Sequence, residues 1–563
     1  MSWKNYHWIG PSRSLVTDNI VSAILWNRYG ETLDVDEFLH GDFNLFDPFL
    51  MMDMSRATRR IKQAIDNKEK ITIFGDYDVD GVTATALLVE LFDFLEYPVD
   101  VHIPDRYEEG YGLKLSSLRE IREGGTDLVI TVDCGIRDEK VIDKMQAEGL
   151  DIIVTDHHNL GDKLPDCQAV LNPKRPQCEY PEKNLAGVGV AYVLARGLLA
   201  ELGGDEKKIE WWLKWNLDLV AVGTIADMVP LTGENRTLVK YGLIVVNRRS
   251  RIGIRKLLSV AGKERGEITA RDVAYVIAPR LNAAGRLNHA MNAFNLLLEK
   301  GELEAEFLAK NLDSNNTRRQ ELTSEILLQV YTMINQNDLP PAVVLADKKW
   351  PCGVVGLVSS RIVEKYHRPA FIAGIEGDMV RGSVRSVPGL NIVQILGMAR
   401  DELQNYGGHD MAAGYSVPLS AWDRFQKKIR KCVAEKMKQI DPRKKISIDI
   451  QVEAAVINMK LWQSINFLAP FGVDNQEPVM LLAAAKLRDK KVIGRDMNHL
   501  KLNFIKATSG RAMEGLWWSN ASFNDRFQLE KEYDILFRLE MNEYRGNQNV
   551  YLNIIDVRES KTK

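Results

Sequence analysis

The chain has 563 residues, of which 45% are hydrophobic and 27% are charged, and its formal net charge is −3. This composition excludes a disordered chain, and the length is enough for roughly three or four domains. No apolar run approaches the roughly 18–20 residues of a membrane-spanning helix, and residues 1–10 lack the apolar core of a signal peptide. Five cysteines without a CxxC pair make a zinc ribbon or a disulfide framework unexpected. We therefore expect a cytoplasmic protein with no membrane partner.

The first large part of the chain, residues 71–230, alternates short apolar segments with amphipathic ones. This pattern is typical of a parallel sheet with helices on both faces. A helix is expected at 82–94, after a turn rich in Gly and Asp. The segment 218–223 is so apolar that its periodicity fits a helix and a buried strand equally well. The strands are expected at 71–74, 100–103, 128–132 and 152–155.

The second half of the chain contains a long helix and two further folded parts. Residues 302–336 contain no Pro and repeat Leu and Ile every three or four positions, which predicts a connecting helix. A second α/β unit follows, and after the basic linker at 441–445 several alternating segments predict an OB-like β-barrel. The expected fold class is therefore α/β with a C-terminal barrel. Its parts are an N-terminal segment at 1–45, a catalytic domain at 46–265, a helical connector at 266–338, a second α/β domain at 339–440 and the barrel at 446–560.

Acidic clusters directly follow three of the predicted strands, as GDYDVDG at 75–81, DCG at 133–135 and DHH at 156–158. Because ligands of open α/β sheets bind at the carboxyl ends of the strands, we expect these clusters to share one crevice. A fourth acid, Asp227, lies in the apolar-flanked turn GTIADMVP and fits the set. Carboxylates this crowded raise one another's pKa, so we expect a bound cation to neutralise them.

The ligand types narrow the choice of cation. Several carboxylates with one or two imidazoles and no thiolate favour Mn²⁺ or Mg²⁺, and a pair of ions would suit hydrolysis of a phosphate ester. A single Asp after a strand is more often a helix cap or a turn residue, and DxDxDG also resembles the start of a calcium loop. No Glu follows at the twelfth position of that loop, and the joint pattern of the clusters favours a metal site.

Four of these motifs, GDYDVDG, VDCG, DHH and GTIADMVPL, resemble in order the metal-binding motifs of the DHH phosphoesterases. GGHDMAAG at 407–414 resembles the signature of the associated DHHA1 domain. PDRYEEGYG at 104–112, PRLNAAGRL at 279–287 and PFGVDNQEP at 470–478 extend the resemblance to the bacterial RecJ family of single-strand-specific 5′→3′ exonucleases. The resemblance covers nearly the whole chain. It implies a parallel-sheet DHH domain, a long helix, a DHHA1 domain and an OB-like nucleic-acid-binding barrel.

The resemblance also implies a two-ion site in which Asp133 bridges the ions. The implied ligands are Asp78 and Asp133 for the first ion, and Asp80, Asp133, His157 and Asp227 for the second. His158 would contact the scissile phosphate. Asp156 would orient the neighbouring imidazole.

One position departs from the pattern of the wider family. Its members often carry a His four residues before the first ligand Asp, and this chain has Phe74 there. The first ion would therefore lack an imidazole. Asp76 either replaces that ligand or caps the following turn, and the sequence leaves both alternatives open.

The near-neutral charge requires any nucleic-acid-binding surface to be local. Arginines in Gly- or Pro-punctuated segments are candidates, because loops can present a guanidinium group to phosphate. These arginines are Arg106, Arg280, Arg286, Arg381 and Arg385. The resemblance favours Arg106, Arg280, Ser383 and Arg385 for the 5′ end, and Gly408 and His409 for the phosphate backbone. Tyr544, in the last predicted hairpin of the barrel, is a candidate for base stacking.

Two other patterns have a structural interpretation. GVG at 187–189 lacks the third Gly of a dinucleotide-binding turn, so we expect it to serve helix packing. Trp211, Trp212 and Trp215 occur at helical spacing and are expected in the core.

The residues and their spacing thus predict a Mn²⁺- or Mg²⁺-dependent phosphoesterase, and the resemblance implies that it is an exonuclease. By resemblance it would degrade single-stranded DNA in the 5′→3′ direction, release 5′-mononucleotides and act in DNA repair and recombination. The alternatives are a DHH-type phosphodiesterase of short oligonucleotides or cyclic dinucleotides, and a non-catalytic single-strand-binding scaffold. Single-stranded DNA is the expected partner, with a single-strand-binding protein and a helicase as further candidates, and the chain is expected to be a monomer.

Overall fold

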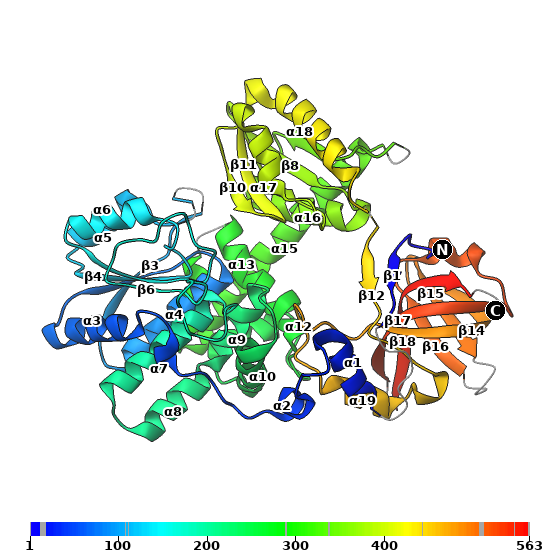
Figure 1. Cartoon of the computed structure of the whole chain (residues 1–563), viewed down its shortest axis with the longest axis horizontal. Coiled ribbons are helices and arrows are strands. Elements are labelled where there is room, and N and C mark those ends of the chain that lie inside the picture. Colours follow the sequence, from blue (N-terminus) through cyan, green and yellow to red (C-terminus); the bar gives the residue numbers. More distant parts are fainter. Residues whose placement is uncertain are drawn as a thin grey trace. The chain divides into compact units, whose positions relative to one another are not determined.

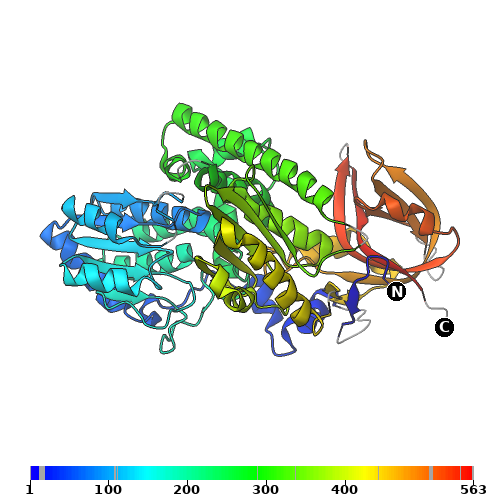
Figure 2. The ribbon, with the colours of Figure 1, turned by 90° about the horizontal axis from the view of Figure 1, so that it is seen from above.

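The computed structural model describes residues 2–11, 19–106, 109–110, 112–287, 290–335, 338–441, 443–505, 512–544 and 547–560, except for the side chains of 287 and 544. The chain forms two compact units, which are described separately (Figures 1 and 2). One unit consists of Phe43–Leu328 and Pro470–Asn475. The other consists of Met1–Asp42, Gln329–Ala469 and Gln476–Lys563.

A five-stranded parallel sheet with the strand order β3-β2-β4-β5-β6 forms the centre of the first unit. Its strands are β2 (Ile71–Phe74), β3 (Val99–His102), β4 (Leu128–Val132), β5 (Asp151–Thr155) and β6 (Ala169–Leu171). The two central strands, β2 and β4, are buried along their whole length, as expected for apolar strands of a parallel sheet. The four predicted strands are confirmed, and the short β6 was not predicted.

Helices cover both faces of this sheet. Leu118 of α5 and Ile142 of α6 pack against Phe74 on one face, whereas α4 and α7 pack in the larger core on the other face (Figure 1). The helices are α3 (Met54–Asn67), α4 (Val79–Phe94), α5 (Leu115–Glu123), α6 (Glu139–Ala147) and α7 (Gly187–Leu202). The helix expected at 82–94 therefore begins three residues earlier, and Asp80 lies in its first turn.

The rest of this unit is helical. The apolar segment 218–223 lies in a helix, and nearly all residues of that helix are buried. The elements are α8 (Glu206–Trp215), α9 (Leu217–Ala226), α10 (Gly233–Arg248), α11 (Ile252–Val260), α12 (Ala270–Asp272), a π-helical turn (Val273–Ile277), α13 (Ala278–Leu287), α14 (Met291–Leu298) and the predicted long helix α15 (Glu302–Met333).

Two interpretations of the sequence were wrong in this region. Arg280 and Arg286 lie on helix α13 and not on a loop, because the segment containing Pro279 and Gly285 is helical. Trp212 is buried as expected, but Trp211 is 59% exposed.

The second unit contains a mixed five-stranded sheet with the order β10-β11-β9-β8-β7, which confirms the predicted second α/β part. Its strands are β7 (Val343–Asp347), β8 (Ala370–Glu376), β9 (Met379–Arg385), β10 (Asn405–His409) and β11 (Ala412–Pro418). Its helices are α16 (Cys352–Tyr366), α17 (Ile392–Met398) and α18 (Trp422–Met437). Arg381 and Arg385 lie on strand β9, so the expectation that loops carry them was wrong as well.

A closed barrel completes the second unit and confirms the OB-like prediction. Its strands are β14 (Met480–Ile493), β15 (His499–Ile505), β16 (Ala512–Trp517), β17 (Glu532–Tyr544) and β18 (Asn547–Glu559). Pairing of β14 with β17 closes the ring, and β13 (Ile450–Gln451) extends β14. The remaining helix of this part is α19 (Met459–Asn466). Short 3₁₀ turns occur at Pro48–Leu50, Arg400–Glu402, Leu419–Ala421, Ala454–Val456 and Ala521–Arg526.

The N-terminal segment packs with the barrel part. Strand β1 (His7–Ile9) pairs in parallel with β12 (Lys445–Ser447), and Trp3 contacts Trp517 and Phe527 of the barrel. The segment also contains α1 (Ile20–Tyr29) and α2 (Val35–His40). Among the described residues, no helix is both long and apolar enough to cross a lipid bilayer.

Candidate metal centre

The turn between β2 and α4 places two carboxylates at the carboxyl edge of the first sheet. Asp78 caps α4, and its Oδ1 accepts hydrogen bonds from the N–H groups of Asp80 (2.9 Å) and Gly81 (3.1 Å). The buried Asp80 carboxylate accepts hydrogen bonds from the N–H groups of Gly187 (2.6 Å) and Val188 (2.8 Å), at the start of α7. Asp80 therefore fixes the N-terminus of a second helix at the same crevice.

Asp133 follows β4 in a left-handed backbone conformation, with φ of 62°, which Asp tolerates better than most residues. Its side chain is buried, and Oδ1 makes no hydrogen bond within the described part of the chain. A Cβ atom on Gly187 would lie 2.6 Å from the Asp133 Cβ, so only glycine allows α7 to begin here. Sequence reasoning missed Gly187 as a site residue, although its position in GVG was the available signal.

His157 and Asp227 complete a cluster around Asp133. His157 Nε2 lies 3.1 Å from Asp133 Oδ1, 3.6 Å from Asp227 Oδ2 and 3.8 Å from Asp80 Oδ2. It makes a hydrogen bond with none of the three carboxylates. Asp227 enters the cluster from the C-terminal end of α9. One imidazole nitrogen thus faces three carboxylates at contact distance.

His158 is held by Asp156 and is the more exposed of the two imidazoles. Its Nδ1 lies 2.8 Å from Asp156 Oδ1, and the same oxygen accepts the N–H groups of His157 (2.7 Å) and His158 (2.9 Å). The other Asp156 oxygen accepts the N–H of Ile136 at 3.0 Å. Both carboxylate oxygens of Asp156 thus make hydrogen bonds that hold the DHH segment and the His158 ring.

The side chains form groups in which the oxygen and nitrogen atoms all lie within 4.8 Å of one another. One group contains Asp76, Asp78 and Asp133, and another contains Asp80, His157 and Asp227. Asp76 is buried, and its Oδ1 has no hydrogen-bond partner in the described residues. Asp78 is the residue that caps α4, whereas Asp76 accepts a backbone hydrogen bond from Tyr77 in the preceding turn, so its role as a ligand stays a prediction. Phe74 points into the core and stacks on His102, 4.8 Å away.

The crowding of these acids changes their pKa values. Burial and the charge of Asp78 raise the pKa of Asp80 to about 7. Burial and the charges of Asp80 and Asp78 raise the pKa of Asp227 to about 9. The pKa of Asp133 is also raised well above its ordinary value by burial and by Asp80. Each shift shows that the protein alone does not compensate the charge of these carboxylates.

The two imidazoles respond in opposite ways. Burial and the charge of His158 lower the pKa of His157 to about 3, so its ring is neutral and keeps a lone pair for a cation. Burial opposes protonation of His158 too, but the hydrogen bond and charge of Asp156 raise its pKa above the ordinary value. Burial favours the neutral form of Asp156, yet His158 holds the pKa of this carboxyl at about 2.

These residues fit a pair of hard divalent cations. The donors are carboxylate oxygens and one neutral imidazole, and several of those atoms are buried without a hydrogen-bond partner among the described residues. Oxygen-rich donor sets of this kind suit Mn²⁺ and Mg²⁺. The structure brings together all six predicted metal-binding residues, which are Asp76, Asp78, Asp80, Asp133, His157 and Asp227.

The predicted arginines of this unit differ in their surroundings. The Arg106 guanidinium lies 5.1 Å from the centre of the Tyr77 ring. Tyr77 lies between the site residues Asp76 and Asp78 in the sequence. Arg286 follows Gly285, where a Cβ would lie 2.8 Å from the carbonyl oxygen of Tyr77, so this part of α13 lies against the same turn. Arg280 instead donates hydrogen bonds to Asp313 (2.8 Å) and to the carbonyl of Val276 (2.8 Å).

Three of the predicted nucleic-acid-binding residues of the second sheet, Arg385, Ser383 and His409, share one face. Two cross-strand rows run over β10, β11 and β9: His409–Ala412–Arg385 and Gly407–Gly414–Ser383. Residues directly opposite each other, or two apart on one strand, point to the same side. Arg385 Nη1 donates a hydrogen bond to Ser383 Oγ at 2.9 Å. Gly408 precedes His409 in β10 and points to the opposite side.

On the barrel, Tyr544 ends β17, and its side chain lies outside the described residues. Elsewhere on the barrel, an aromatic side chain is exposed. Trp518, directly after β16, is 44% exposed, and its ring lies edge-on to His499 with centroids 4.9 Å apart. His499 begins β15, whose side chains alternate between the barrel core and the outer face.

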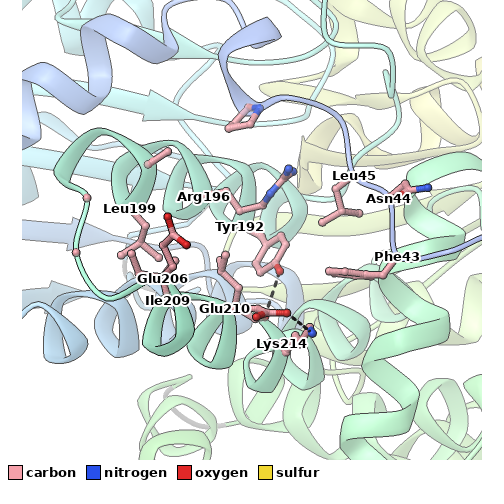
Figure 3. A pocket seen from close by; sticks show the side chains of 15 residues that line it. Phe43, Asn44, Leu45, Tyr192, Arg196, Leu199, Glu206, Ile209, Glu210 and Lys214 are labelled. Atoms are coloured by element: carbon pink, nitrogen blue, oxygen red, sulfur yellow. Dashed lines mark hydrogen bonds and ion pairs between the residues drawn. The ribbon is translucent and has the colours of Figure 1, made fainter.

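A separate cavity of about 790 Å³ lies between residues 43–48, α7 and α8 (Figure 3). Its lining includes Phe43, Tyr192, Arg196 and Glu210. Tyr192 Oη donates a hydrogen bond to the carbonyl of Leu213 at 3.1 Å. None of the predicted site residues lines this cavity, so it is independent of the metal centre.

Comparisons with known proteins agree with this organisation. Family models match residues 70–224 (DHH family, N-terminal domain), 339–435 (DHHA1 domain) and 448–556 (RecJ OB domain). The single-stranded-DNA-specific exonuclease RecJ of Bacillus subtilis is 36% identical over 547 residues, which cover 96% of this chain and 68% of that protein.

Two crystal structures of RecJ from Thermus thermophilus are similar in fold. The complex with Mn²⁺ superposes with a TM-score of 0.84 at 29% identity, covering 100% of this chain and 80% of that one. The complex with Mg²⁺ superposes with a TM-score of 0.77 at 29% identity, covering 99% and 79%.

Proposed function

The chain belongs to the RecJ family, and from this premise we propose that it is a metal-dependent exonuclease of single-stranded DNA. It acts in the 5′→3′ direction, releases 5′-mononucleotides, and serves DNA repair and recombination. The observation that carries the proposal is the position of His157 Nε2, which faces Asp133, Asp80 and Asp227 within 3.8 Å. A neutral donor surrounded by unneutralised carboxylates is suited to a catalytic divalent cation.

Two Mn²⁺ or Mg²⁺ ions would be held by the two groups of the crevice. Asp76, Asp78 and Asp133 would hold one ion, and Asp80, His157 and Asp227, together with Asp133, would hold the other. When bound, the ions supply Lewis acidity that activates water and stabilises negative charge on phosphorus. Asp133 belongs to the first group, and its Oδ1 lies 3.1 Å from His157 Nε2 of the second, so its carboxylate would connect the two groups.

The second imidazole would act directly on the substrate. His158 keeps a proton on Nδ1 for its hydrogen bond to Asp156, which leaves Nε2 to contact an oxygen of the scissile phosphate. Because Asp156 raises the pKa of His158, the ring is positively charged over a wider pH range and favours developing negative charge. The same Asp156 oxygen holds both backbone N–H groups of the imidazole pair, so the ring is positioned before substrate binds.

Strand binding would use surfaces in both units. In the first unit, Arg106 would contact the phosphates of the 5′ end, and Arg280 could do so after exchanging its bonds to Asp313 and Val276. On the second sheet, Arg385, Ser383 and His409 would contact phosphates across the small side chains of β11. Backbone contacts of this kind are independent of base sequence.

The barrel would add base stacking. Exposed aromatic rings on an OB-type barrel stack on bases of any kind, which suits a nuclease without sequence preference. Trp518 with His499 is the candidate pair among the described side chains. A cytoplasmic monomer, and a helicase or single-strand-binding protein as partner, stay predictions.

The proposal is tested by degrading the same oligonucleotide labelled at its 5′ or its 3′ end, with Mn²⁺ present. We expect the 5′ label to appear first as a mononucleotide, while the 3′-labelled strand shortens gradually. Asp133→Asn provides the inactive control. Faster turnover of a dinucleotide, a cyclic dinucleotide or pyrophosphate than of the oligonucleotide would contradict the proposal and favour a small-substrate phosphodiesterase. Tight binding without cleavage would favour a scaffold.

A further inference from the structure

Lys174 lies at the carboxyl edge of the first sheet, beside the DHH segment. It follows β6, whose Leu171 pairs with Thr155 at the end of β5. The intervening Asn172 is buried and donates a hydrogen bond from Nδ2 to the carbonyl of His158 at 3.0 Å. The N–H of Lys174 in turn donates to Asn172 Oδ1 at 2.9 Å. A continuous hydrogen-bond path therefore fixes the backbone of Lys174 relative to His158.

The charge of Lys174 acts on the metal centre from one side. Its ammonium group interacts electrostatically with Asp156 and His157 of the DHH segment and with Asp227 at the end of α9. Together with the hydrogen-bond path to His158, this places Lys174 beside the DHH segment and Asp227. Arg137 is a further positive group in its surroundings.

The ammonium group nevertheless has no protein partner. Within the described part of the chain, Lys174 Nζ makes no hydrogen bond, and no carboxylate lies within 4.0 Å of it. Other lysines of the same unit are paired, for example Lys163 with Asp143 at 2.7 Å. If Lys174 served only to balance the charge of the carboxylates, its ammonium group should lie closer to them, because the energy of an ion pair increases at shorter range. Its distance from them argues against that role.

We propose that Lys174 is a further substrate-contacting residue, whose ammonium group binds a phosphate oxygen of the single strand next to the Asp80–His157–Asp227 group. This inference rests on the proposed nuclease function. A compact ammonium group on a flexible stem suits a single phosphate oxygen, and Lys174 is half-buried at the edge of the crevice. None of the sequence motifs pointed to this position.

The test compares Lys174→Met and Lys174→Arg with the surface control Lys208→Met on α8. Binding is measured by fluorescence anisotropy with a labelled, phosphorothioate-linked oligothymidylate, in the presence of Mn²⁺ and at several salt concentrations. We expect Lys174→Met to weaken binding roughly ten-fold, the scale of one hydrogen bond to a charged group. The slope of log affinity against log salt should flatten by about 0.7, the value for one phosphate contact on a single strand. Lys174→Arg and Lys208→Met should bind like the wild type.

Two results would overturn the inference. One is an unchanged affinity and salt slope for Lys174→Met. The other is an unchanged slope combined with tighter Mn²⁺ binding by calorimetry, which would mean that Lys174 only balances the charge of the acids. Both are read against a wild type that degrades the unmodified oligonucleotide. If the wild type does not degrade it, the proposed function itself fails, which is a different outcome.

Discussion

A Cβ atom on Gly187 would lie 2.6 Å from the Cβ of Asp133 and 2.8 Å from its Oδ1. The first turn of α7 is therefore packed against the carboxylate that belongs to one metal group and contacts His157 of the other. The N–H of Gly187 also donates to Asp80, so one residue holds two of the site's acids in place. This contact joins segments that are more than fifty residues apart in the chain.

We predict that Gly187→Ala reduces turnover by roughly a hundred-fold, because small displacements of catalytic groups are costly in rate. The added methyl group must displace either Asp133 or the start of α7, and both belong to the site. Turnover with Mn²⁺ and the melting temperature are measured together.

The matched control is Gly189→Ala in the same helix. A Cβ there would meet side-chain atoms of Leu185 at 3.2 Å, which can shift, and no acid of the site. Equal activity losses in the two variants would mean that any added methyl group in this turn disturbs α7, and the specific role of Gly187 would be rejected.

The second prediction concerns the coupling of metal binding to stability. Metal that binds only the folded state stabilises it, by about 2.7 kcal/mol at a hundred times the dissociation constant. We expect Mn²⁺ to raise the melting temperature of the wild type and to raise that of Asp133→Asn much less, because Asp133 belongs to one candidate group and lies 3.1 Å from His157 of the other. Without metal, Asp133→Asn should melt at a higher temperature than the wild type, since it removes a buried carboxylate repelled by Asp80.

Asp143→Asn is the control for this experiment, because Asp143 is bound to Lys163 on the surface, away from the acids of the site. Mn²⁺ should raise the melting temperature of Asp143→Asn as much as it raises that of the wild type. If Mn²⁺ raises the melting temperature of Asp133→Asn by the same amount as well, Asp133 is not a metal-binding residue.

Much of the first sheet could be predicted because its strands are short, buried and apolar. ITIF, LVITV and IIVT are each followed by acids, and the rule that ligands bind at the carboxyl ends of parallel strands brought those acids together. Strand β6 was missed because only three residues, Ala169–Leu171, carry its signal. Lys174, which follows β6, was therefore not placed at the crevice.

Helix α13 shows why local signals failed elsewhere. Pro279 and Gly285 suggested a loop, but Gly285 is a packing position: a Cβ there would lie 2.8 Å from the carbonyl oxygen of Tyr77. The glycine reflects a tertiary contact with the turn that carries Asp76 and Asp78, which no local pattern reveals. The engagement of Arg280 with Asp313 of α15 is likewise a contact between distant segments.

The third prediction tests the shared face of the second sheet. A Cβ on Gly414 would have open space around it, with the nearest atom, the carbonyl oxygen of Gly382, 4.0 Å away. Gly414→Val should therefore fold normally, since a β-branched residue suits a strand. It would also fill the space between Ser383 and Gly407, and we expect the affinity for single-stranded DNA to fall several-fold.

The control is Ser416→Val, two residues further along β11 on the same face and opposite Arg381. Binding is measured by fluorescence anisotropy, and the melting temperature of each variant is recorded. If Ser416→Val weakens binding as much as Gly414→Val does, the single-stranded DNA does not bind specifically along the row formed by Ser383, Gly414 and Gly407.

The last prediction decides the role of Asp76. Its carboxylate is buried in one group with Asp78 and Asp133, and its Oδ1 has no hydrogen-bond partner in the described residues. Phe74 stacks on His102 and offers no donor atom. We therefore expect Asp76→Ala to need at least about ten-fold more Mn²⁺ for its half-maximal rate, the effect expected on losing one ligand or its support.

Variants of Asp78 provide the comparison for Asp76→Ala, provided that the substituted residue can still cap α4. Asp78→Ala would also remove the cap of α4, which costs about 1 kcal/mol, whereas Asp78→Asn keeps a capping oxygen. Both Asp76→Ala and Asp78→Asn should shift the Mn²⁺ titration to higher concentration while the melting temperature without metal stays level or rises, because each removes a repelled charge. If the Asp76→Ala titration overlays that of the wild type and only Asp78→Asn is shifted, Asp76 is no ligand, and water must complete the first ion's coordination.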